Sequence, residues 1–365
     1  MSPLAQFSMS PDKNPIAVLI SYLKRIEGLK VGSYEAAVKS QELARLYKLE
    51  PIVKLLPCLI ELCDRRPINV FVDELDRGWD ASEDSKAFVS GLFQACVSIN
   101  EHAPNLRVYV SLRRELYDSI PSLYEDAQKY RDIIETITWD ETSLLSLIAK
   151  RIRHSMPELA VEPDDVQCWN TVFSETLDYR QNKSFNYLID RTLYRPREII
   201  QFCTDSADEA KKTNAWPINY GIISSAEVSY SGDRLRDIAA EYRFQYPGLI
   251  SIFEVFRGKV FTFDRDELEL ICLAIATGEY RIDSLAVWAL NQDPGYLIEI
   301  LWRIGFLRAQ AVGGVKAMRR SGSSYLGSHQ VENLNLGNLN RFQVHPMFRA
   351  HLGMKEPKGG AKPDE

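Results

Sequence analysis

The chain has 365 residues, of which 45% are hydrophobic and 26% are charged, a composition typical of a globular protein with two or three domains. This composition excludes a collagen-like, low-complexity or wholly disordered chain. No apolar run is long enough to cross a bilayer, and the first residues have neither the basic nor the apolar region of a secretion signal. We therefore expect a cytoplasmic protein without a membrane partner.

The cysteines and the distribution of charge further restrict the kind of protein that this chain can be. The six cysteines occur singly in apolar segments, without a C-x-x-C pair, which indicates reduced, buried thiols rather than a disulfide or zinc framework. The net charge of −6 is unevenly distributed, because residues 303–363 hold ten basic and only two acidic side chains. This basic end is either a site for an anion or a solvated tail.

The first part of the chain predicts a βαβ unit. Apolar residues recur with helical spacing through 14–63, and a nearly continuous apolar run at 68–72 then indicates a strand buried on both faces. An amphipathic helix over 85–101 and a second strand over 106–112 follow. Because the connections are short, we expect the two strands to be parallel.

The rest of the chain predicts helices and one pair of antiparallel strands. Residues 140–216 have helical patterns with breaks at prolines. Further elements are expected in the order of a winged helix-turn-helix domain, with helices over 231–245, 265–277, 282–289 and 294–305 and strands over 306–309 and 342–345. We expect the tail from Lys355 onward to be disordered.

Two acidic residues follow directly after the first expected strand. Asp73 and Glu74 lie at the carboxyl end of that strand, where α/β folds bind their ligands. In a nucleotide hydrolase, the first carboxylate of such a pair holds Mg²⁺, usually through a water molecule, and the second orients or deprotonates the attacking water. An apolar run that ends in two acids is also a common polar turn, so the pair alone leaves both interpretations open.

Arginines occupy two further positions that suit a phosphate. Arg113 follows the second strand, whose carboxyl end lies beside that of the first when the strands are parallel. Arg195 and Arg197 flank Pro196, which takes the first position of an expected helix. A helix start with flanking arginines suits phosphate contact, and a structural salt bridge explains the same residues equally well.

In this order the elements resemble P-loop ATPases of the STAND and AAA+ kind. They are most similar to bacterial STAND-like ATPases, many of which are found in conflict or antiphage-defence contexts. The resemblance extends from about residue 60 to about residue 350. Its parts are a Walker B strand (FVDELDRGW, 71–79), a sensor-1 strand (VYVSLR, 108–113), the start of a helical lid (137–152), a sensor-2 region (YRPR, 194–197) and a winged-helix end (304–307 and 344–348).

The resemblance implies a fold, cofactors and site residues. The implied fold is α/β followed by mostly α, with a partial P-loop NTPase parallel sheet over 1–138, a helical lid over 139–228, a C-terminal winged helix-turn-helix over 229–354 and a disordered tail over 355–365. The implied cofactors are ATP and Mg²⁺. By resemblance, Glu74 and Arg113 are catalytic, Asp73 binds the metal, and the nucleotide contacts are Asp73, Asp76, Arg195 and Arg197.

The sequence departs from this family at the phosphate-binding loop. The pattern G-x-x-x-x-G-K-[ST] is absent, and Gly258-Lys259, the only Gly-Lys pair before the tail, is followed by valine. Without this loop the β- and γ-phosphates have neither a backbone cradle nor a neutralising lysine. We therefore expect an incomplete or degenerate ATPase module without its N-terminal third, explained by a truncated gene, an internal start or a split into subunits.

Three functions from different classes stay open. In the first, the chain contributes half of an ATPase site, and a phosphate-binding loop supplied from elsewhere completes it. In the second, the chain is a non-catalytic regulator that uses the fold for protein contacts. In the third, it is a DNA-binding winged-helix protein. In the third case Lys316, Arg319 and Arg320 contact phosphates, and we expect weak, non-specific DNA binding at most because the helix over 296–304 is mostly apolar. An exposed sheet edge also predicts pairing with a second copy or a protein partner.

Overall fold

In the computed structural model the chain forms two compact units, Met1–Thr136 and Ile137–Glu365. The structure describes residues 58, 61–76, 79–80, 82–102, 105–113, 116–117, 120, 123, 131–159, 164–310, 325–331 and 334–357. The helices expected over 14–63 therefore lie almost wholly outside the described residues, as do Lys316, Arg319 and Arg320. No described helix is long and apolar enough to cross a membrane.

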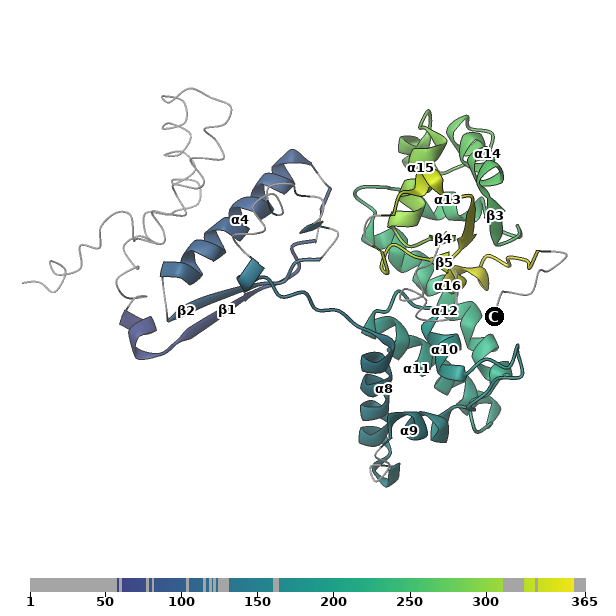
Figure 1. The fold of residues 1–365 in the computed structure, drawn as a ribbon, viewed down its shortest axis with the longest axis horizontal. Helices are drawn as coiled ribbons and strands as arrows, with labels where there is room; N and C mark the ends of the chain where they lie inside the picture. The colour runs from purple at the N-terminus through teal and green to yellow at the C-terminus, as the bar shows by residue number, and fades with distance from the viewer. Residues whose placement is uncertain are drawn as a thin grey trace, which may run out of the picture. The chain divides into compact units, whose positions relative to one another are not determined.

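The first unit contains the expected βαβ arrangement (Figure 1). Strands β1 (Ile68–Val72) and β2 (Leu106–Val110) are parallel and pair in register from end to end. Helix α4 (Glu83–His102) connects them and lies along the sheet, and a short helix η3 (Arg131–Ile133) follows later in the unit. Parallel pairing brings the carboxyl ends of both strands to the same edge of the sheet, as the sequence predicts.

Only one face of this sheet is well covered. The side chains at 106, 108 and 110 are half-buried on the face that packs against α4. On the other face Phe71 and Tyr109 are 76% and 52% exposed, and their rings stack with centroids 5.1 Å apart. The expectation that the first strand is buried on both faces is therefore wrong. Strand propensity and a single packed face are enough to explain its apolar run.

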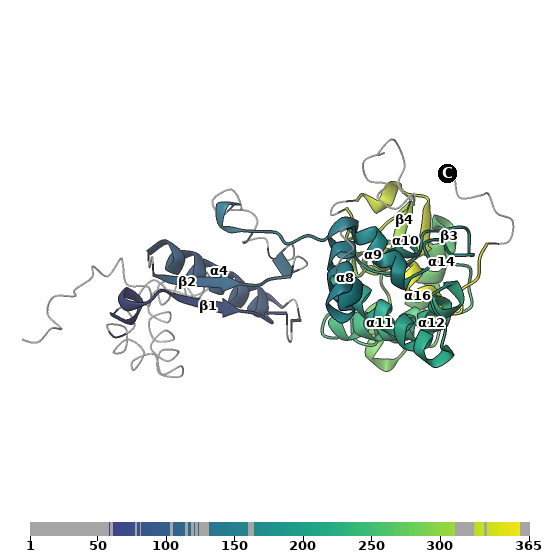
Figure 2. The same cartoon turned by 90° about the horizontal axis from the view of Figure 1, so that it is seen from below.

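The second unit begins with a helical part. Its helices are α8 (Glu141–Ser155), η4 (Pro157–Leu159), α9 (Asp165–Val172), α10 (Ser184–Ile189), α11 (Pro196–Thr213) and α12 (Tyr220–Glu241). Asp140 caps α8 by accepting a hydrogen bond from Ser143 N, and Pro196 provides the fixed backbone at the start of α11. Helices α11 and α12 lie side by side (Figure 2), and α8 packs against α9.

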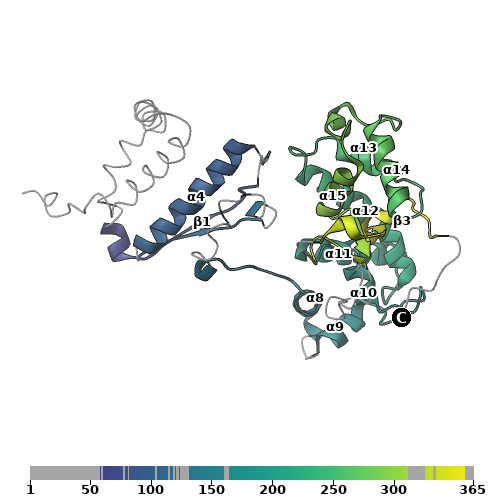
Figure 3. The same cartoon turned by 45° about the horizontal axis from the view of Figure 1, so that its top comes forward.

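The C-terminal part of the second unit contains a four-stranded antiparallel sheet with the order β3-β6-β4-β5. Its elements in chain order are α13 (Leu249–Glu254), β3 (Thr262–Asp264), α14 (Arg265–Ala276), η5 (Ser284–Ala289), α15 (Pro294–Arg303), β4 (Leu307–Gln310), β5 (Tyr325–Leu326), η7 (Leu336–Asn338), β6 (Arg341–Val344) and α16 (Pro346–Arg349). Figure 3 shows α13, α14 and α15 at one end of the unit and α8 and α9 at the other. The expected glycine stop after α15 is confirmed, because Gly305 has a φ of 82° and a Cβ there would lie 3.1 Å from the Leu193 side chain.

One hydrophobic core joins the two parts of the second unit. It extends from Leu144 in α8 to Leu352 beyond α16 and includes Phe202 of α11 together with Phe253 and Phe306 of the C-terminal part. Helix α12 packs against α11 and also against α13 and α16. The boundary expected between residues 228 and 229 falls inside this continuous helix.

The beginning of the expected tail belongs to the folded part. Lys355 N donates a hydrogen bond to Lys259 O at 2.9 Å, and Phe261 N donates to Lys355 O at 3.1 Å. The carboxylate of Glu356 lies 2.6 Å from Arg180 Nη2. The expectation of disorder from Lys355 onward is therefore wrong for these two residues, because they pair with distant segments that the sequence alone does not bring together.

Candidate functional site

Asp73 and Glu74 form a turn at the carboxyl end of β1. Ser111 N donates a hydrogen bond to Val72 O at 2.8 Å, so the pairing with β2 continues to the last residue before the turn. Glu74 N then donates to Asp73 Oδ1 at 2.8 Å, and the backbone of Glu74 is left-handed with a φ of 61°. This conformation is unfavourable for a residue other than glycine, and it leaves two exposed carboxylates at the sheet edge.

An ion pair connects the segments that follow the two strands. Arg113 Nε lies 2.9 Å from Asp76 Oδ2, and both side chains are partly exposed. Such a pair contributes only about 0–1 kcal/mol to stability, so its main effect is to orient the guanidinium. Asp76 O accepts a hydrogen bond from Trp79 N at 3.1 Å, and Trp79 is buried in the same hydrophobic cluster as Val89 of α4. The buried indole therefore anchors the acidic loop on the body of the unit.

Ser111 is a site residue that was not among the sequence predictions. It follows β2 and lies one position beyond the last register pair, which places it opposite Asp73. Its exposed hydroxyl can donate a hydrogen bond to a carboxylate or to a water molecule held there. The strand register would have identified it, because pairing 68 with 106 also aligns 73 with 111.

These residues fit a hydrated divalent cation better than they fit a whole nucleotide. A carboxylate with a neighbouring hydroxyl suits Mg²⁺, which keeps several of its water ligands. Within the part of the chain that the structure describes, no group of three or more His, Cys, Asp or Glu side chains could hold a metal ion. The described residues at this edge also provide no glycine-rich cradle for phosphates.

The two arginines at the start of α11 have different surroundings. Arg195 Nη1 lies 2.9 Å from Glu241 Oε2 of α12 and 4.0 Å from Glu198 Oε1, so the salt-bridge interpretation applies to Arg195. Arg197 is exposed, and its side chain makes no hydrogen bond or ion pair with any described residue. Of the two, Arg197 therefore has the guanidinium that is available to an anion. Both arginines belong to the second unit, whereas Asp73 belongs to the first.

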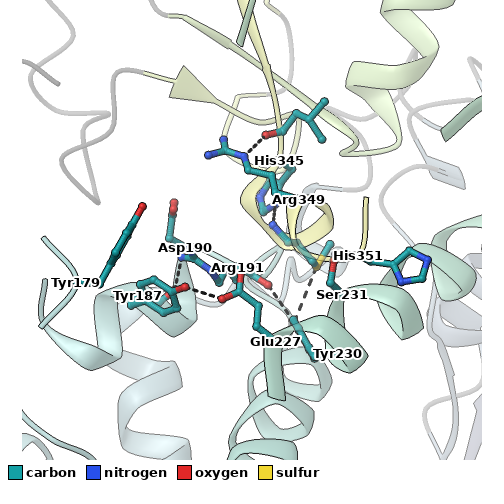
Figure 4. Close-up of polar contacts among 12 residues, drawn as sticks. Tyr179, Tyr187, Asp190, Arg191, Glu227, Tyr230, Ser231, His345, Arg349 and His351 are labelled. Carbon is teal, nitrogen blue, oxygen red and sulfur yellow. Dashed lines mark hydrogen bonds and ion pairs between the residues drawn. The ribbon is translucent and has the colours of Figure 1, made fainter. Parts of the chain in front are cut away.

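A buried polar cluster lies where α10 and α12 meet the C-terminal elements (Figure 4). Arg308 of β4 is 1% exposed, and its Nη1 lies 2.7 Å from Oδ1 of Asp190, the residue after α10. Arg191 Nε lies 2.6 Å from Glu227 Oε1 of α12. The hydroxyl of Tyr187 donates to the other oxygen of Glu227 at 2.5 Å. Two charged pairs thus connect the end of α10 to the sheet and to α12.

The C-terminal segment adds His345 and Arg349 to this cluster. His345 is fully buried, and its Nδ1 accepts a hydrogen bond from Met347 N at 3.2 Å as the cap of α16. Arg349 donates to Val344 O and to Gln343 Oε1, both at 2.8 Å. The cluster was not predicted from the sequence. The sequence feature that could have revealed it is the presence of charged residues inside otherwise apolar segments.

The charges in the cluster set the protonation states of two of its members. Burial is the largest single effect and by itself would raise the pKa of the Asp190 carboxyl. The charges of Arg308 and Arg191, with the hydrogen bond from Arg308, together outweigh burial and hold that pKa below its usual value. Burial, reinforced by the charge of Arg308, lowers the pKa of His345 well below its usual value. At neutral pH the cluster therefore contains an ionised Asp190 and an uncharged His345, an arrangement suited to holding the unit together.

Comparisons with known proteins identify similarity in both parts of the chain. The family of FunZ-associated C-terminal helical domains matches residues 142–239, from α8 almost to the end of α12. A transposon gamma-delta 80.3 kDa protein of Escherichia coli is 25% identical over 315 residues, which are 84% of this chain and 43% of that protein. Allergen Alt a 2 of Alternaria alternata is 29% identical over 136 residues, which are 36% of this chain and 70% of the allergen. No solved structure matches the chain.

These similarities bear on the domain organisation. The helical-domain match includes most of the region expected as a lid and continues beyond residue 228 to residue 239, near the end of α12. The alignment with the transposon-encoded protein covers 84% of the chain, so it must extend over both units. The chain spans less than half the length of that relative.

We predict that Asp190→Asn destabilises the second unit. The substitution leaves the buried guanidinium of Arg308 without its carboxylate, and removing one partner of a buried ion pair costs about 3 kcal/mol in the free energy of unfolding. Urea unfolding followed by tryptophan fluorescence reports mainly on this unit, because five of the six tryptophans lie in it. Asp233→Asn is the control, since Asp233 pairs with Arg236 on the exposed surface of α12. Equal shifts in both variants would contradict the prediction.

Acid is expected to weaken the second unit through the same cluster. The folded state keeps His345 uncharged, whereas an unfolded histidine takes up a proton below about pH 6.5, so the free energy of unfolding falls as the pH drops below that value. The stability from Asp190 is present above about pH 4 and is lost as the pH falls through the lowered pKa. In urea titrations between pH 7 and pH 5, His345→Gln should reduce the decline by up to about 1.4 kcal/mol per pH unit. His154→Gln, on the exposed face of α8, should leave it unchanged.

Proposed function

We propose that the first unit is part of a nucleoside-triphosphate-hydrolysing site in a protein similar to bacterial STAND-like ATPases, and that the second unit regulates it. The observation that carries this proposal is the shared edge of the parallel sheet. There the acidic turn at 73–74 follows β1 and the segment 111–113 follows β2. Ligands of open α/β sheets bind at such carboxyl ends, and both negative and positive side chains are present here.

Each residue at this edge has a distinct role in the proposed site. Bound ATP and Mg²⁺ supply the phosphoryl group that is attacked and the neutralisation of its charge. Asp73 orients the water ligands of the cation, with Ser111 as its neighbour, and Glu74 accepts the proton of the attacking water. Asp76 positions Arg113, whose guanidinium stabilises negative charge on the transferred group.

The missing phosphate-binding loop leads to a specific expectation for the chain as it stands. Without a backbone cradle or a P-loop lysine, we expect ATP to bind with a Kd of about 1 mM or weaker and to be hydrolysed hardly at all. Calorimetric titration of the full chain with ATP, with and without Mg²⁺, measures this. Asp73→Asn should remove the dependence on Mg²⁺, and Glu101→Gln on the exposed surface of α4 should retain it. Micromolar binding by this chain would contradict the expectation.

A separate measurement of ATP turnover tests the proposed role of Glu74 in hydrolysis. In a form of the protein that includes a phosphate-binding loop, Glu74→Gln should lower kcat by about 10²–10⁴-fold, because the amide cannot accept the proton of water. Glu101→Gln should turn over ATP at the original rate. Unchanged hydrolysis by Glu74→Gln would remove this residue from the mechanism while leaving nucleotide binding to be judged separately.

We further propose that the segment from α13 to β6 is a winged helix-turn-helix domain. The chain order of α13, β3, α14, α15, β4 and β6 supports this proposal, as does the antiparallel order β3-β6-β4 within the sheet. The connection between β4 and β5 carries Lys316, Arg319 and Arg320 and lies outside the described residues. In such a domain α15 is the helix that would enter the major groove of DNA.

The surface of α15 favours protein contact over base recognition. Five of its residues are buried in the core of the unit, at 297, 298, 300, 301 and 302. Its exposed charges, Glu299 and Arg303, form an ion pair with each other, and Tyr296 is 45% exposed beside them. A helix whose two exposed charges are paired with each other offers little to base edges, whereas an exposed tyrosine such as Tyr296 is common in protein interfaces.

We predict weak DNA binding that depends on salt and not on sequence. The contacts would come from Lys316, Arg319 and Arg320 to phosphates, so the affinity should fall steeply between roughly 50 and 200 mM salt in electrophoretic shift assays. Replacing the three residues together by alanine should abolish the shift, and Arg236→Ala on α12 serves as the control. Sequence-selective binding that survives the higher salt would support a DNA-reading function instead.

A further inference from the structure

The outer edge of β1 is open. The parallel register directs the backbone N–H and C=O groups of residues 68, 70 and 72 toward β2, and it directs those of Asn69 and Phe71 away from it. The structure contains no hydrogen bond from a described residue to the backbone of Asn69 or Phe71 on that side. Both residues are exposed.

A side chain occupies the middle of the opposite edge of the sheet. Asn100 of α4 reaches the middle of β2, where its Nδ2 donates a hydrogen bond to Val108 O at 2.9 Å. Val108 N donates in turn to Asn100 Oδ1 at 2.8 Å. This amide occupies the groups that another strand would need. An added strand beside β2 would therefore have to displace this amide from Val108, whereas beside β1 no described residue occupies the outward groups.

Strand β1 also lacks the features that usually protect a free edge. Its five residues, INVFV, include no charged residue and no proline, and the strand is not covered on the face that carries Phe71. The stacked rings of Phe71 and Tyr109 extend this apolar surface across the sheet. An edge of this kind forms a template for another strand of suitable sequence.

We propose that this edge pairs with β1 of a second copy of the chain. The two strands run antiparallel about a two-fold axis at Val70, so that the outward-facing Asn69 lies opposite Phe71 of the partner subunit. This register joins the outward N–H and C=O groups of each copy to those of the other. The result is a four-stranded sheet in which the Phe71 and Tyr109 rings of both copies line one face.

The charges at the two ends of β1 favour a second copy of the chain as the strand that pairs with this edge. Arg66 precedes the strand and Glu74 follows it, and each is four residues from Val70. Antiparallel pairing at Val70 therefore places the exposed Arg66 at the same end of the joined sheet as the acidic turn that carries Glu74 of the partner subunit, twice by symmetry. A second copy thus supplies an apolar strand and opposite charges at the matching ends of the strand. The pairing does not depend on the nucleotide site proposed above.

Disulfide cross-linking tests the register directly. In the proposed pairing Val70 faces Val70 of the partner subunit in a non-hydrogen-bonded pair, where Cα atoms lie about 4.5 Å apart, within the range of a disulfide. Val70→Cys in a Cys58→Ser background should form a covalent dimer of the full chain under mild oxidation. Cys58 is replaced because it is an exposed thiol. Cys58→Ser alone, treated in the same way, should stay largely monomeric on a non-reducing gel.

Light scattering after size-exclusion chromatography tests the edge itself. The N–H of Asn69 takes no part in the β1–β2 ladder, so Asn69→Pro should preserve the unit, which circular dichroism can check, while removing one outward donor from each copy. We expect Asn69→Pro to raise the dimer Kd about tenfold or more and Asn69→Ala to change it little. A wild-type chain that is monomeric at high concentration would overturn the proposal. Dimers unaffected by Asn69→Pro, or an absence of the Val70→Cys cross-link, would overturn the interface.

Discussion

The positive charge of Arg308 is buried inside strand β4, and the arrangement of the second unit depends on how that charge is balanced. A guanidinium keeps its proton at neutral pH, so it is stable in such a position only with a carboxylate close by. Asp190 supplies this carboxylate at 2.7 Å from the end of α10. Because the two residues belong to different parts of the unit, their contact fixes the helical part against the C-terminal sheet.

The neighbouring contacts extend this connection through the unit. Arg191 binds Glu227, which brings α12 to the same point, and Tyr230 O–H donates to the backbone carbonyl of Arg191 at 3.0 Å. His351 N donates to Ser231 Oγ at 3.1 Å, so the segment after α16 is held on α12 as well. The helical region similar to the FunZ-associated C-terminal domain is therefore not a separate body in this chain, since it shares its core and its buried charges with the sheet that follows.

The first unit depends on a different constraint, which is the incompleteness of a two-stranded parallel sheet. Parallel strands generally have both faces packed and neighbours on both sides. Here the described residues provide one helix and one side-chain amide at the middle of the β2 edge, so an aromatic face and the edge of β1 are left exposed. The same parallel pairing places Asp73, Ser111 and Arg113 at one end of the sheet. The proposed catalytic edge and the proposed dimer edge are thus two consequences of a single pair of strands.

Much of the local structure was determined by the sequence alone. The strand at 68–72, the helix after it and a parallel second strand from Leu106 follow from hydrophobic periodicity and connection length, which act over a few residues. The second strand was predicted to extend to residue 112 and ends at Val110. Helix α15 was likewise predictable, because Pro294 starts it and Gly305 ends it. The two acids after β1 were recognisable as site candidates because their position relative to the strand is local.

The tertiary structure alone decided which charges are paired and which surfaces are covered. Arg195 and Arg197 look equivalent in sequence, yet Arg195 binds Glu241, 46 residues away, whereas Arg197 stays exposed. Asp190 and Arg308 are 118 residues apart, so no pattern within a helix or strand connects them. The exposure of Phe71 has the same cause, because an apolar strand residue has the same sequence signature whether or not another element packs on it. Periodicity determines which way a side chain points within its element, and only the packing of distant elements determines what it meets there.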